Sequence, residues 1–276
     1  AFVGTTKNGT SFLVNNLAEM LSTQGVRTAV LDLTKNRNSY YIYTQNDEEL
    51  RKIAYNSINK LTEGIAEGIQ VNRNLSVYTC LPDNEQNFEE VEAILSTLVQ
   101  NYSLVLLDCD FDTDYEYFAK TQEIYLVQSM DVLTIQPLTA FLRDLKAKNV
   151  LNESKLRVVI NKDIKVKSLT EKTIIGGMAY YNDPAMSFMT ELFDKDTIRN
   201  AYITFDEQTY SKYLEGIVNC KISLNGYSKE FLLSLKNLAS MVYPLVNSRS
   251  TYDNSRRGRN NQGNMNDTLK RMRSNY

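Results

Sequence analysis

The stretch Gly4-Thr5-Thr6-Lys7-Asn8-Gly9-Thr10-Ser11 is the part of this chain that decides its fold. It follows the short apolar run Phe2–Val3 and precedes a segment whose apolar residues repeat with helical spacing. The spacing GxxxxG-x-[ST] is typical of a phosphate-binding P-loop. There, backbone N–H groups and the next helix N-terminus cradle a phosphate, and the Ser or Thr hydroxyl ligates Mg²⁺. The same pattern also fits a tight turn before a capped helix.

The loop lacks the lysine that P-loops place directly before the Ser or Thr, because Thr10 occupies that position. The missing group is a point charge on the β- and γ-phosphates, which normally supplies much of the transition-state stabilisation. Lys7 is near enough in the loop to fold back and substitute for it. We therefore expect phosphate binding by the backbone, with slow or absent hydrolysis.

Two carboxylates end apolar strand-like runs farther along the chain. Leu104–Asp108 has a Walker B pattern, and Val30-Leu31-Asp32 places a second carboxylate at another strand end. In an open α/β sheet these strand ends line the ligand crevice. Ser11, Asp32 and Asp108 are therefore the expected Mg²⁺ site, with both carboxylates acting through water. Either Asp could instead be a helix N-cap or a turn residue.

Strand-like and helical segments alternate along the chain. Apolar strand-like runs cover Phe2–Val3, Thr28–Leu33, Leu75–Thr79, Leu104–Asp108, Glu123–Val127 and Leu156–Ile160, and helical spacing covers Phe12–Leu21, Val91–Leu98, Leu133–Leu145 and Phe231–Leu245. This alternation predicts a doubly wound α/β fold, in which helices cover both faces of a mostly parallel sheet.

Composition excludes several classes of site. The 276-residue chain contains no His, which excludes Ser-His-Asp and Cys-His catalysis and His-containing zinc sites. Its three cysteines, Cys80, Cys109 and Cys220, are too scattered for a CxxC motif and indicate reduced residues of a cytosolic protein. The chain begins without Met inside an apolar segment, so we expect further residues upstream.

Charge divides the chain into an expected domain, residues 1–246, and a basic flexible tail, residues 247–276. The tail carries seven Lys or Arg and two Asp. Met265, Leu269, Met272 and Tyr276 would form one stripe of a basic amphipathic helix, which suits an anionic membrane surface. Arg256–Arg259 could instead contact nucleic acid phosphates, or the tail could be a disordered, solubilising segment.

The order of these motifs resembles the ParA/MinD superfamily of deviant Walker A ATPases over residues 1–165. The stretch Gln24–Leu33, QGVRTAVLDL, is close to the segment that precedes the first switch of that family. Gly9-Thr10-Ser11 in place of Gly-Lys-Thr is most similar to the TadZ/CpaE branch, whose members help to place pilus-secretion machinery at a cell pole.

The chain also departs from the family pattern. Thr5 occupies the position of the signature lysine, and Thr34 that of the second acidic residue of the first switch. Asn161 matches a residue that commonly contacts adenine in the family, although a strand-ending turn is an equal alternative. Asp110 and Asp112 could orient a water molecule or could simply be solvated loop acids.

The resemblance implies ATP or ADP with Mg²⁺ as ligands, held by Gly4, Thr5, Thr6, Lys7, Asn8, Gly9, Thr10, Ser11 and Asn161. It also implies a homodimer, a protein partner in a larger assembly, and a cytoplasmic location that could be peripheral at the membrane or a cell pole. The candidate catalytic residues are Lys7, Asp32, Asp108 and Asp110.

Three hypotheses about function follow. The first is a degenerate scaffold that hydrolyses ATP weakly or not at all and positions a pilus, a secretion or conjugation apparatus, or partitioned DNA. The second is an active partition-type ATPase in which Lys7 replaces the missing lysine. The third is an interaction module that acts through a membrane- or DNA-binding tail.

Overall fold

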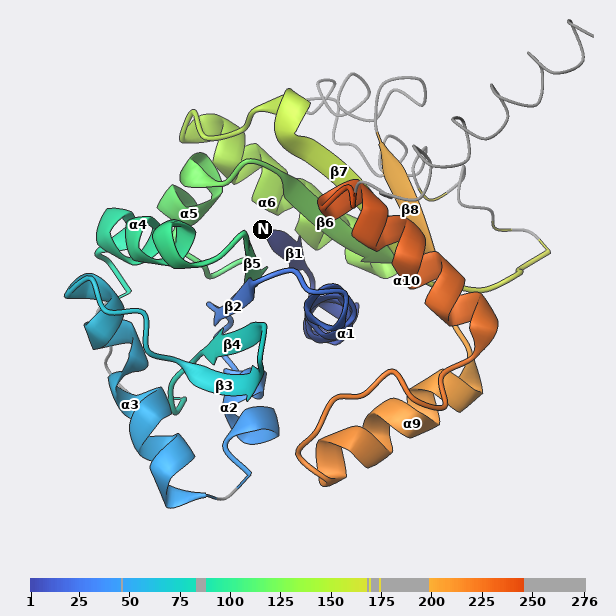
Figure 1. Ribbon diagram of the computed structural model, residues 1–276. Coiled ribbons are helices and arrows are strands. Elements are labelled where there is room, and N and C mark those ends of the chain that lie inside the picture. The colour runs from blue at the N-terminus through green and yellow to red at the C-terminus, as the bar shows by residue number, and fades with distance from the viewer. Residues whose placement is uncertain (46, 83–87, 168, 170–173, 175–198, 246–276) are drawn as a thin grey trace, which may run out of the picture. The chain divides into compact units, whose positions relative to one another are not determined.

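The computed structural model describes residues 1–45, 47–82, 88–167, 169, 174 and 199–245 (Figure 1). The chain divides into two units, Ala1–Met241 and Val242–Tyr276. Most of the second unit, including the basic tail at 247–276, lies outside the described residues.

Eight described strands form one sheet in the order β3-β4-β2-β5-β1-β6-β7-β8. Their bounds are β1 (Phe2–Gly4), β2 (Thr28–Asp32), β3 (Ile69–Asn72), β4 (Leu75–Tyr78), β5 (Leu104–Cys109), β6 (Ile124–Ser129), β7 (Leu156–Asp163) and β8 (Asn200–Thr204). Every neighbouring pair is parallel except β3 and β4. The predicted doubly wound, mostly parallel sheet is confirmed.

The two outermost strands were not predicted. In β3 only Ile69 is fully buried, because an edge strand needs few apolar residues. In β8 the buried residues Ala201 and Ile203 alternate with more exposed ones, a pattern too short to separate from a loop. Most residues of the six inner strands are buried on both faces of the sheet, so the sequences of these strands are mainly apolar.

Helices cover both faces of the sheet (Figure 1). The bounds are α1 (Thr10–Thr23), α2 (Asn38–Tyr43), α3 (Glu48–Thr62), α4 (Val91–Asn101), α5 (Tyr115–Lys120), α6 (Ile135–Ala147), α9 (Glu207–Val218) and α10 (Lys229–Val242), with short 3₁₀ turns η1 (Val132–Thr134) and η2 (Glu153–Lys155). One core cluster joins α3, α4, α5 and α6 to the sheet. On the other face Phe12 of α1 packs edge-on against Tyr213 of α9 and Phe231 of α10.

Helix α1, which begins at the phosphate loop, is fixed by two buried asparagines. Asn15 Oδ1 accepts a hydrogen bond from Tyr43 Oη of α2 at 3.0 Å, and Asn16 Oδ1 accepts one from Tyr227 Oη at 2.9 Å. Both side-chain amides also donate to backbone carbonyls one turn earlier in α1. These bonds orient α1 against α2 and the α9–α10 connection, and so fix where the loop lies.

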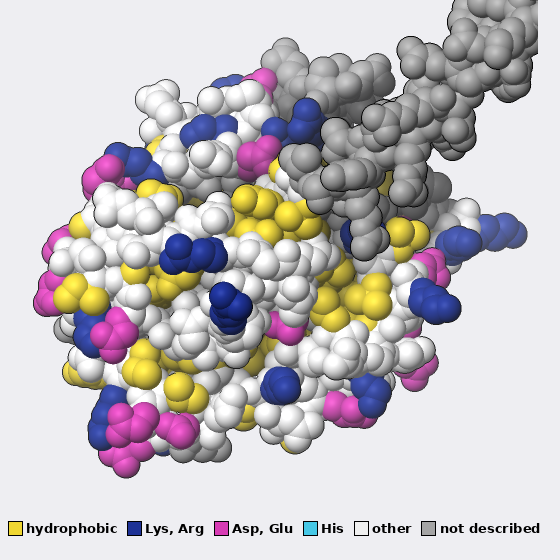
Figure 2. All heavy atoms as spheres, viewed as in Figure 1, with side chains coloured by type: hydrophobic (Ala, Val, Ile, Leu, Met, Phe, Trp, Pro, Cys, Tyr) yellow, Lys and Arg dark blue, Asp and Glu magenta, His cyan; other side chains and the backbone are white. Residues whose placement is uncertain are grey.

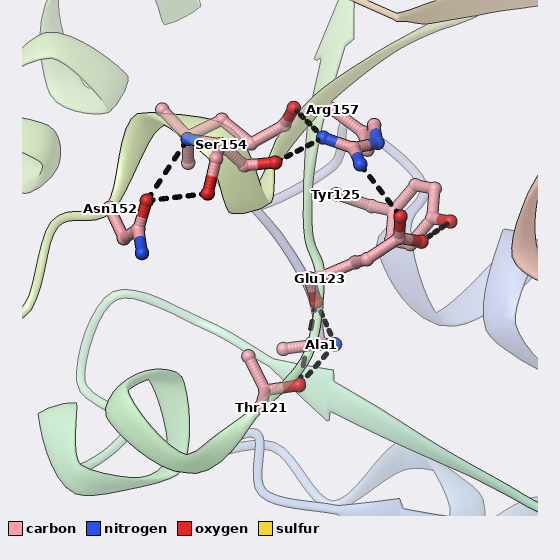
Figure 3. Close-up of polar contacts among 8 residues, drawn as sticks. Ala1, Thr121, Glu123, Tyr125, Asn152, Ser154 and Arg157 are labelled. Carbon is pink, nitrogen blue, oxygen red and sulfur yellow. Dashed lines mark hydrogen bonds and ion pairs between the residues drawn. The ribbon is translucent and has the colours of Figure 1, made fainter.

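A second polar network lies at the other end of β6 and β7, away from the phosphate loop (Figure 3). Arg157 Nη2 donates to Glu123 Oε1 at 2.8 Å, and the Tyr125 hydroxyl donates to the other oxygen of that carboxylate. The Ala1 nitrogen donates to the Glu123 carbonyl at 2.7 Å. This network ties the starts of the two strands together and leaves their carboxyl ends to form the site.

The surface of the described residues has mixed charge. On the face drawn in Figure 2, acidic and basic side chains are interspersed, with hydrophobic side chains between them. Among the described residues, no helix combines the length and apolar character needed to cross a bilayer.

Candidate functional site at the phosphate loop

The loop between β1 and α1 lies where the sheet reverses its winding. β1 has β5 on one side and β6 on the other, and α1 begins directly after the loop. A cavity of about 700 Å³ opens over the loop, large enough for a nucleotide-sized ligand. It is lined by Gly4, Thr5, Thr6, Lys7, Gly9, Thr10, Ser11, Phe12, Thr34, Asn36, Asn38, Cys109, Asp110, Lys162, Tyr210 and Tyr213. The loop and the ends of β2, β5 and β7 therefore meet at one site.

Glycine is required at both ends of the loop. Gly9 has φ +85°, and a Cβ there would lie 2.5 Å from Asn161 Nδ2. A Cβ on Gly4 would lie 2.5 Å from the Val127 carbonyl oxygen of β6. The two glycines thus allow the loop to pass close to β6 and β7, as a phosphate-cradling turn requires.

Side chains from the ends of β6 and β7 hold the loop in place. Asn161 Nδ2 donates to the Asn8 carbonyl oxygen at 2.7 Å. Ser129 Oγ donates to Asn8 Oδ1 at 2.8 Å, and Asn8 Nδ2 donates to Thr134 Oγ1 at 3.3 Å. Asn161 is almost fully buried and contacts the loop backbone, so its first role here is to shape the loop. Its expected contact with adenine stays a prediction.

Lys162, which the sequence analysis did not select, also contacts the loop. Its Nζ donates to the Lys7 carbonyl oxygen at 2.7 Å, and its side chain lines the cavity. Lys7 has φ +72° and an exposed side chain at the cavity wall. The one signal in the sequence was that Lys162 directly follows Asn161, at a strand end that faces the loop.

Asp32 and Asp108 lie side by side at the ends of β2 and β5 and are fully buried. Asp32 Oδ1 accepts hydrogen bonds from Thr34 N at 3.1 Å and Thr34 Oγ1 at 2.6 Å, and Oδ2 accepts one from Ser39 N at 3.0 Å. Burial raises the pKa of Asp32, although these hydrogen bonds and the Arg37 charge partly offset the effect. Asp32 thus fixes the segment that leads into α2.

The carboxyl group of Asp108 differs from that of Asp32 in its hydrogen bonding and its pKa. Neither of its carboxyl oxygens has a hydrogen-bond partner among the described residues. Burial raises the pKa of Asp108 well above its usual range, and the neighbouring Asp32 charge raises it further, while the Ser11 hydroxyl lowers it in part. A buried carboxylate of this kind is stabilised by a proton or by a cation.

Asp110 connects the loops that follow β2 and β5. Its Oδ2 accepts a hydrogen bond from Lys35 N at 2.6 Å, and its Oδ1 accepts one from Asp112 N at 3.0 Å. Asp110 lines the cavity, whereas the exposed side chain of Asp112 is not part of the lining. Both oxygens of Asp110 are therefore engaged in holding loop geometry.

The residues at the loop fit a phosphate with Mg²⁺. The buried oxygens that lack a hydrogen-bond partner among the described residues include Thr5 Oγ1 and Thr10 Oγ1 in the loop and both carboxyl oxygens of Asp108. Buried polar atoms normally have partners, so a cluster of unpaired ones indicates a ligand position. The described residues contain no group of three acidic, Cys or His side chains that could hold a metal without further ligands. Mg²⁺ is commonly bound by one or two protein groups plus phosphate oxygens, which matches Ser11 and Asp108.

Many solved structures have a fold similar to that of this chain. A protein assigned to plasmid partition from Borrelia burgdorferi B31, bound to AMPPNP, aligns with a TM-score of 0.60 and 13% identity over 87% of this chain and 96% of its own. A ParA family ATPase from Chlorobium tepidum aligns at 0.57 and 15%, over 86% and 96%. MinD from Pyrococcus horikoshii, complexed with Mg-ADP, aligns at 0.55 and 17%, over 89% and 97%. The chain has the ParA/MinD fold. No protein-family model and no curated protein matches its sequence.

A smaller hollow adjoins the cavity of this ParA/MinD fold on the α9–α10 side. It has a volume of about 30 Å³ and is lined by Phe12, Asn161, Lys162, Thr204, Phe205, Asp206, Thr209, Tyr210 and Phe231. Such a volume admits little more than a water molecule, so a base could enter only if the partly exposed Phe205 or Tyr210 moved aside.

Proposed function

We propose that this protein binds Mg-ATP or Mg-ADP at the phosphate loop and uses the bound nucleotide to position a larger assembly. The proposal rests mainly on the buried oxygens of Thr5, Thr10 and Asp108, which lack hydrogen-bond partners among the described residues. They lie at the phosphate loop of a chain that has the ParA/MinD fold. Two similar structures with that fold were determined with AMPPNP and with Mg-ADP.

Each part of the site has a role in this proposal. Backbone N–H groups from Gly4 to Ser11 and the N-terminus of α1 bind the phosphates. Ser11 ligates Mg²⁺ directly and Asp108 through water, while the hydrogen-bonded Asp32 keeps the 34–39 segment against the site. Mg²⁺ would neutralise phosphate charge and relieve the buried Asp108 carboxylate. The hollow bordered by Phe205 and Tyr210 would receive the adenine once one of these two side chains moves aside, with Asn161 at its edge.

Hydrolysis would be weak. Thr5 and Thr10 replace both lysines that the family uses, and Asp110 already accepts backbone hydrogen bonds through both oxygens. These replacements support a degenerate member of the TadZ/CpaE type that positions a pilus, a secretion or conjugation apparatus, or DNA. The second candidate, an active partition-type ATPase, is favoured by the exposed Lys7 side chain at the cavity wall.

We also propose that the protein acts as a homodimer in the cytoplasm and binds a protein partner at the membrane or a cell pole. The tail at 247–276 would supply contacts to anionic lipid or nucleic acid. Its sequence is the basis for this part of the proposal, since the tail lies outside the described residues.

Phosphate release and molar mass by light scattering, measured together in Mg-ATP, test the proposal. We expect nucleotide to shift the mass from monomer to dimer with little turnover. Turnover that is present in the wild type and lost in Lys7→Ala would establish the active ATPase instead. Constant mass together with no binding would overturn both candidates. Ser240→Ala, which removes an exposed α10 hydroxyl that donates to the Lys236 carbonyl of the same helix, serves as the control.

A further inference from the structure

Thr5 and Thr10 replace the two lysines of the loop, but two other lysine side chains line the cavity. Among the described lining residues, Lys7 and Lys162 are the Lys or Arg side chains. Arg37 lies near the site, but its guanidinium already has other partners. Its Nη1 donates to the Asp32 carbonyl at 2.6 Å, and its guanidinium lies over the Phe88 ring at 4.1 Å. A polyphosphate therefore has two candidate cationic partners.

Lys162 is the better positioned of the two. Asn161, the residue before it, donates to the Asn8 carbonyl, and the Lys162 ammonium donates to the Lys7 carbonyl at 2.7 Å. The Lys162 side chain therefore packs along the loop. Its Cε lies 3.8 Å from the position that a Cβ on Gly9 would take. A single carbonyl uses one of the three ammonium N–H groups, so the other two remain available to an anion.

The backbone at Lys162 is also unusual. Lys162 has φ +55°, a left-handed conformation that costs a non-glycine residue roughly 1 kcal/mol or more. Such strain persists where the surrounding structure enforces it, and it is common in ligand clamps. The position of Lys162 is thus set by the end of β7, whereas no hydrogen bond or ion pair with the described residues holds the ammonium of Lys7.

We propose that Lys162 supplies, from the end of β7, the cationic contact to the nucleotide phosphates that Thr5 and Thr10 cannot make. This inference rests on the proposed nucleotide site and concerns binding of the polyphosphate, not its hydrolysis. An ammonium that is already ordered loses little entropy when an anion arrives, and its hydrogen bonds to phosphate are charge-assisted.

The test compares Lys162→Met, Lys162→Arg, Lys7→Met and Lys165→Met with the wild type. Lys165 is an exposed lysine three residues farther along that does not line the cavity, so it is the matched control. Calorimetry measures the affinities for Mg-ADP and for inorganic tripolyphosphate. We expect Lys162→Met to weaken both by more than about tenfold, Lys162→Arg to retain most of the affinity, and Lys165→Met to change neither.

The outcomes separate this inference from the proposed function. If the wild type binds neither probe, the nucleotide site and the role of Lys162 both fall. If the wild type binds and Lys162→Met binds equally well, only the role of Lys162 falls. Should Lys162→Met fold poorly, acetylation of the wild type is the second measurement. Mg-ADP should then protect Lys162 but not Lys165, and equal modification of Lys162 with and without Mg-ADP would overturn the inference.

Discussion

Asp32 and Asp108 are direct neighbours in the parallel register of β2 and β5, and both side chains are fully buried. The two carboxyl groups differ in the hydrogen-bond donors that surround them. Thr34 and Ser39 donate hydrogen bonds to Asp32. Neither carboxyl oxygen of Asp108 accepts a hydrogen bond of normal geometry from the described residues, although the Ser11 hydroxyl lies close enough to lower the pKa of this carboxyl group in part. The pair therefore places a buried carboxyl group, whose ionised form lacks hydrogen-bond donors of normal geometry, beside the phosphate loop. That position is costly for the fold alone and favourable when a cation binds.

Replacing Asp108 should stabilise the nucleotide-free protein and weaken its ligand binding. Asp108→Asn removes a carboxyl group whose ionised form is disfavoured by burial and by the neighbouring Asp32. We expect the free energy of unfolding to rise by about 1–3 kcal/mol at pH 7, while Mg-dependent nucleotide affinity falls more than about tenfold. Urea unfolding and calorimetry measure the two effects. A less stable variant would show that the Asp108 carboxylate makes a stabilising contact.

The same carboxylate predicts a pH dependence. The pKa of Asp108 is raised in the folded state above the ordinary value of 3.8, so the folded protein retains a proton that the unfolded chain has lost. Stability should therefore fall as pH rises from about 4 through the folded-state pKa. Urea unfolding across this range should show the advantage of Asp108→Asn over the wild type growing with pH. An advantage that stays constant with pH would contradict the raised pKa.

Alanine substitutions at two glycines with similar φ angles distinguish the cost of the backbone conformation from the cost of a steric clash. Gly9 and Gly25 have φ of +85° and +91°, but an added Cβ meets Asn161 Nδ2 at 2.5 Å only at Gly9 and nothing within 4 Å at Gly25. Gly25→Ala should cost about 1–2 kcal/mol for its backbone alone. Gly9→Ala should cost a further 1–3 kcal/mol or so and displace Asn161 from the loop. Equal melting temperatures for the two variants would contradict the close approach at Gly9.

The hydrogen bond between Tyr43 and Asn15 should contribute measurably to stability. Tyr43→Phe leaves the buried Asn15 Oδ1 without its donor, and the expected loss is about 1–3 kcal/mol. Tyr41→Phe, on the same helix but 59% exposed, should change stability by less than about 0.5 kcal/mol. Chemical denaturation of the two variants gives the comparison, and similar values would mean that the buried bond is not significant.

The cysteines should differ sharply in reactivity. Cys80 and Cys109 are buried, and burial raises the pKa of both thiols, which disfavours the reactive thiolate. Cys220 is partly exposed. A thiol titration of the native protein should therefore detect one fast-reacting group, and denaturant should release the other two. Rapid reaction of all three would show that the core around β5 opens easily.

Much of the fold could be predicted from the sequence because the inner strands are buried on both faces. Leu104–Asp108 and Leu156–Ile160 are mainly apolar, and they lie within β5 and β7. β3 could not be found in this way, since as an edge strand it buries little. The helices α2 and α5 have six residues each, which is too short for helical spacing to emerge.

The site was only partly predictable for a different reason. Loop spacing located Gly4–Ser11, and strand-end position located Asp32 and Asp108. The hydrogen bond from Lys162 to Lys7 joins residues far apart in the sequence, so no local pattern could reveal it. Likewise, the sequence does not show that Asp32 is satisfied by Thr34 while Asp108 is not, because this depends on how the β2 and β5 loops turn.

The most direct test of the account is a calorimetric titration of the full chain with ADP, first with excess Mg²⁺ and then with the metal chelated. Ser11→Ala is titrated in parallel. We expect saturable 1:1 binding that requires Mg²⁺ and is weakened more than about tenfold in Ser11→Ala. The absence of binding in excess Mg²⁺, or binding unaffected by both chelation and Ser11→Ala, would contradict the claim that this loop holds a Mg-nucleotide.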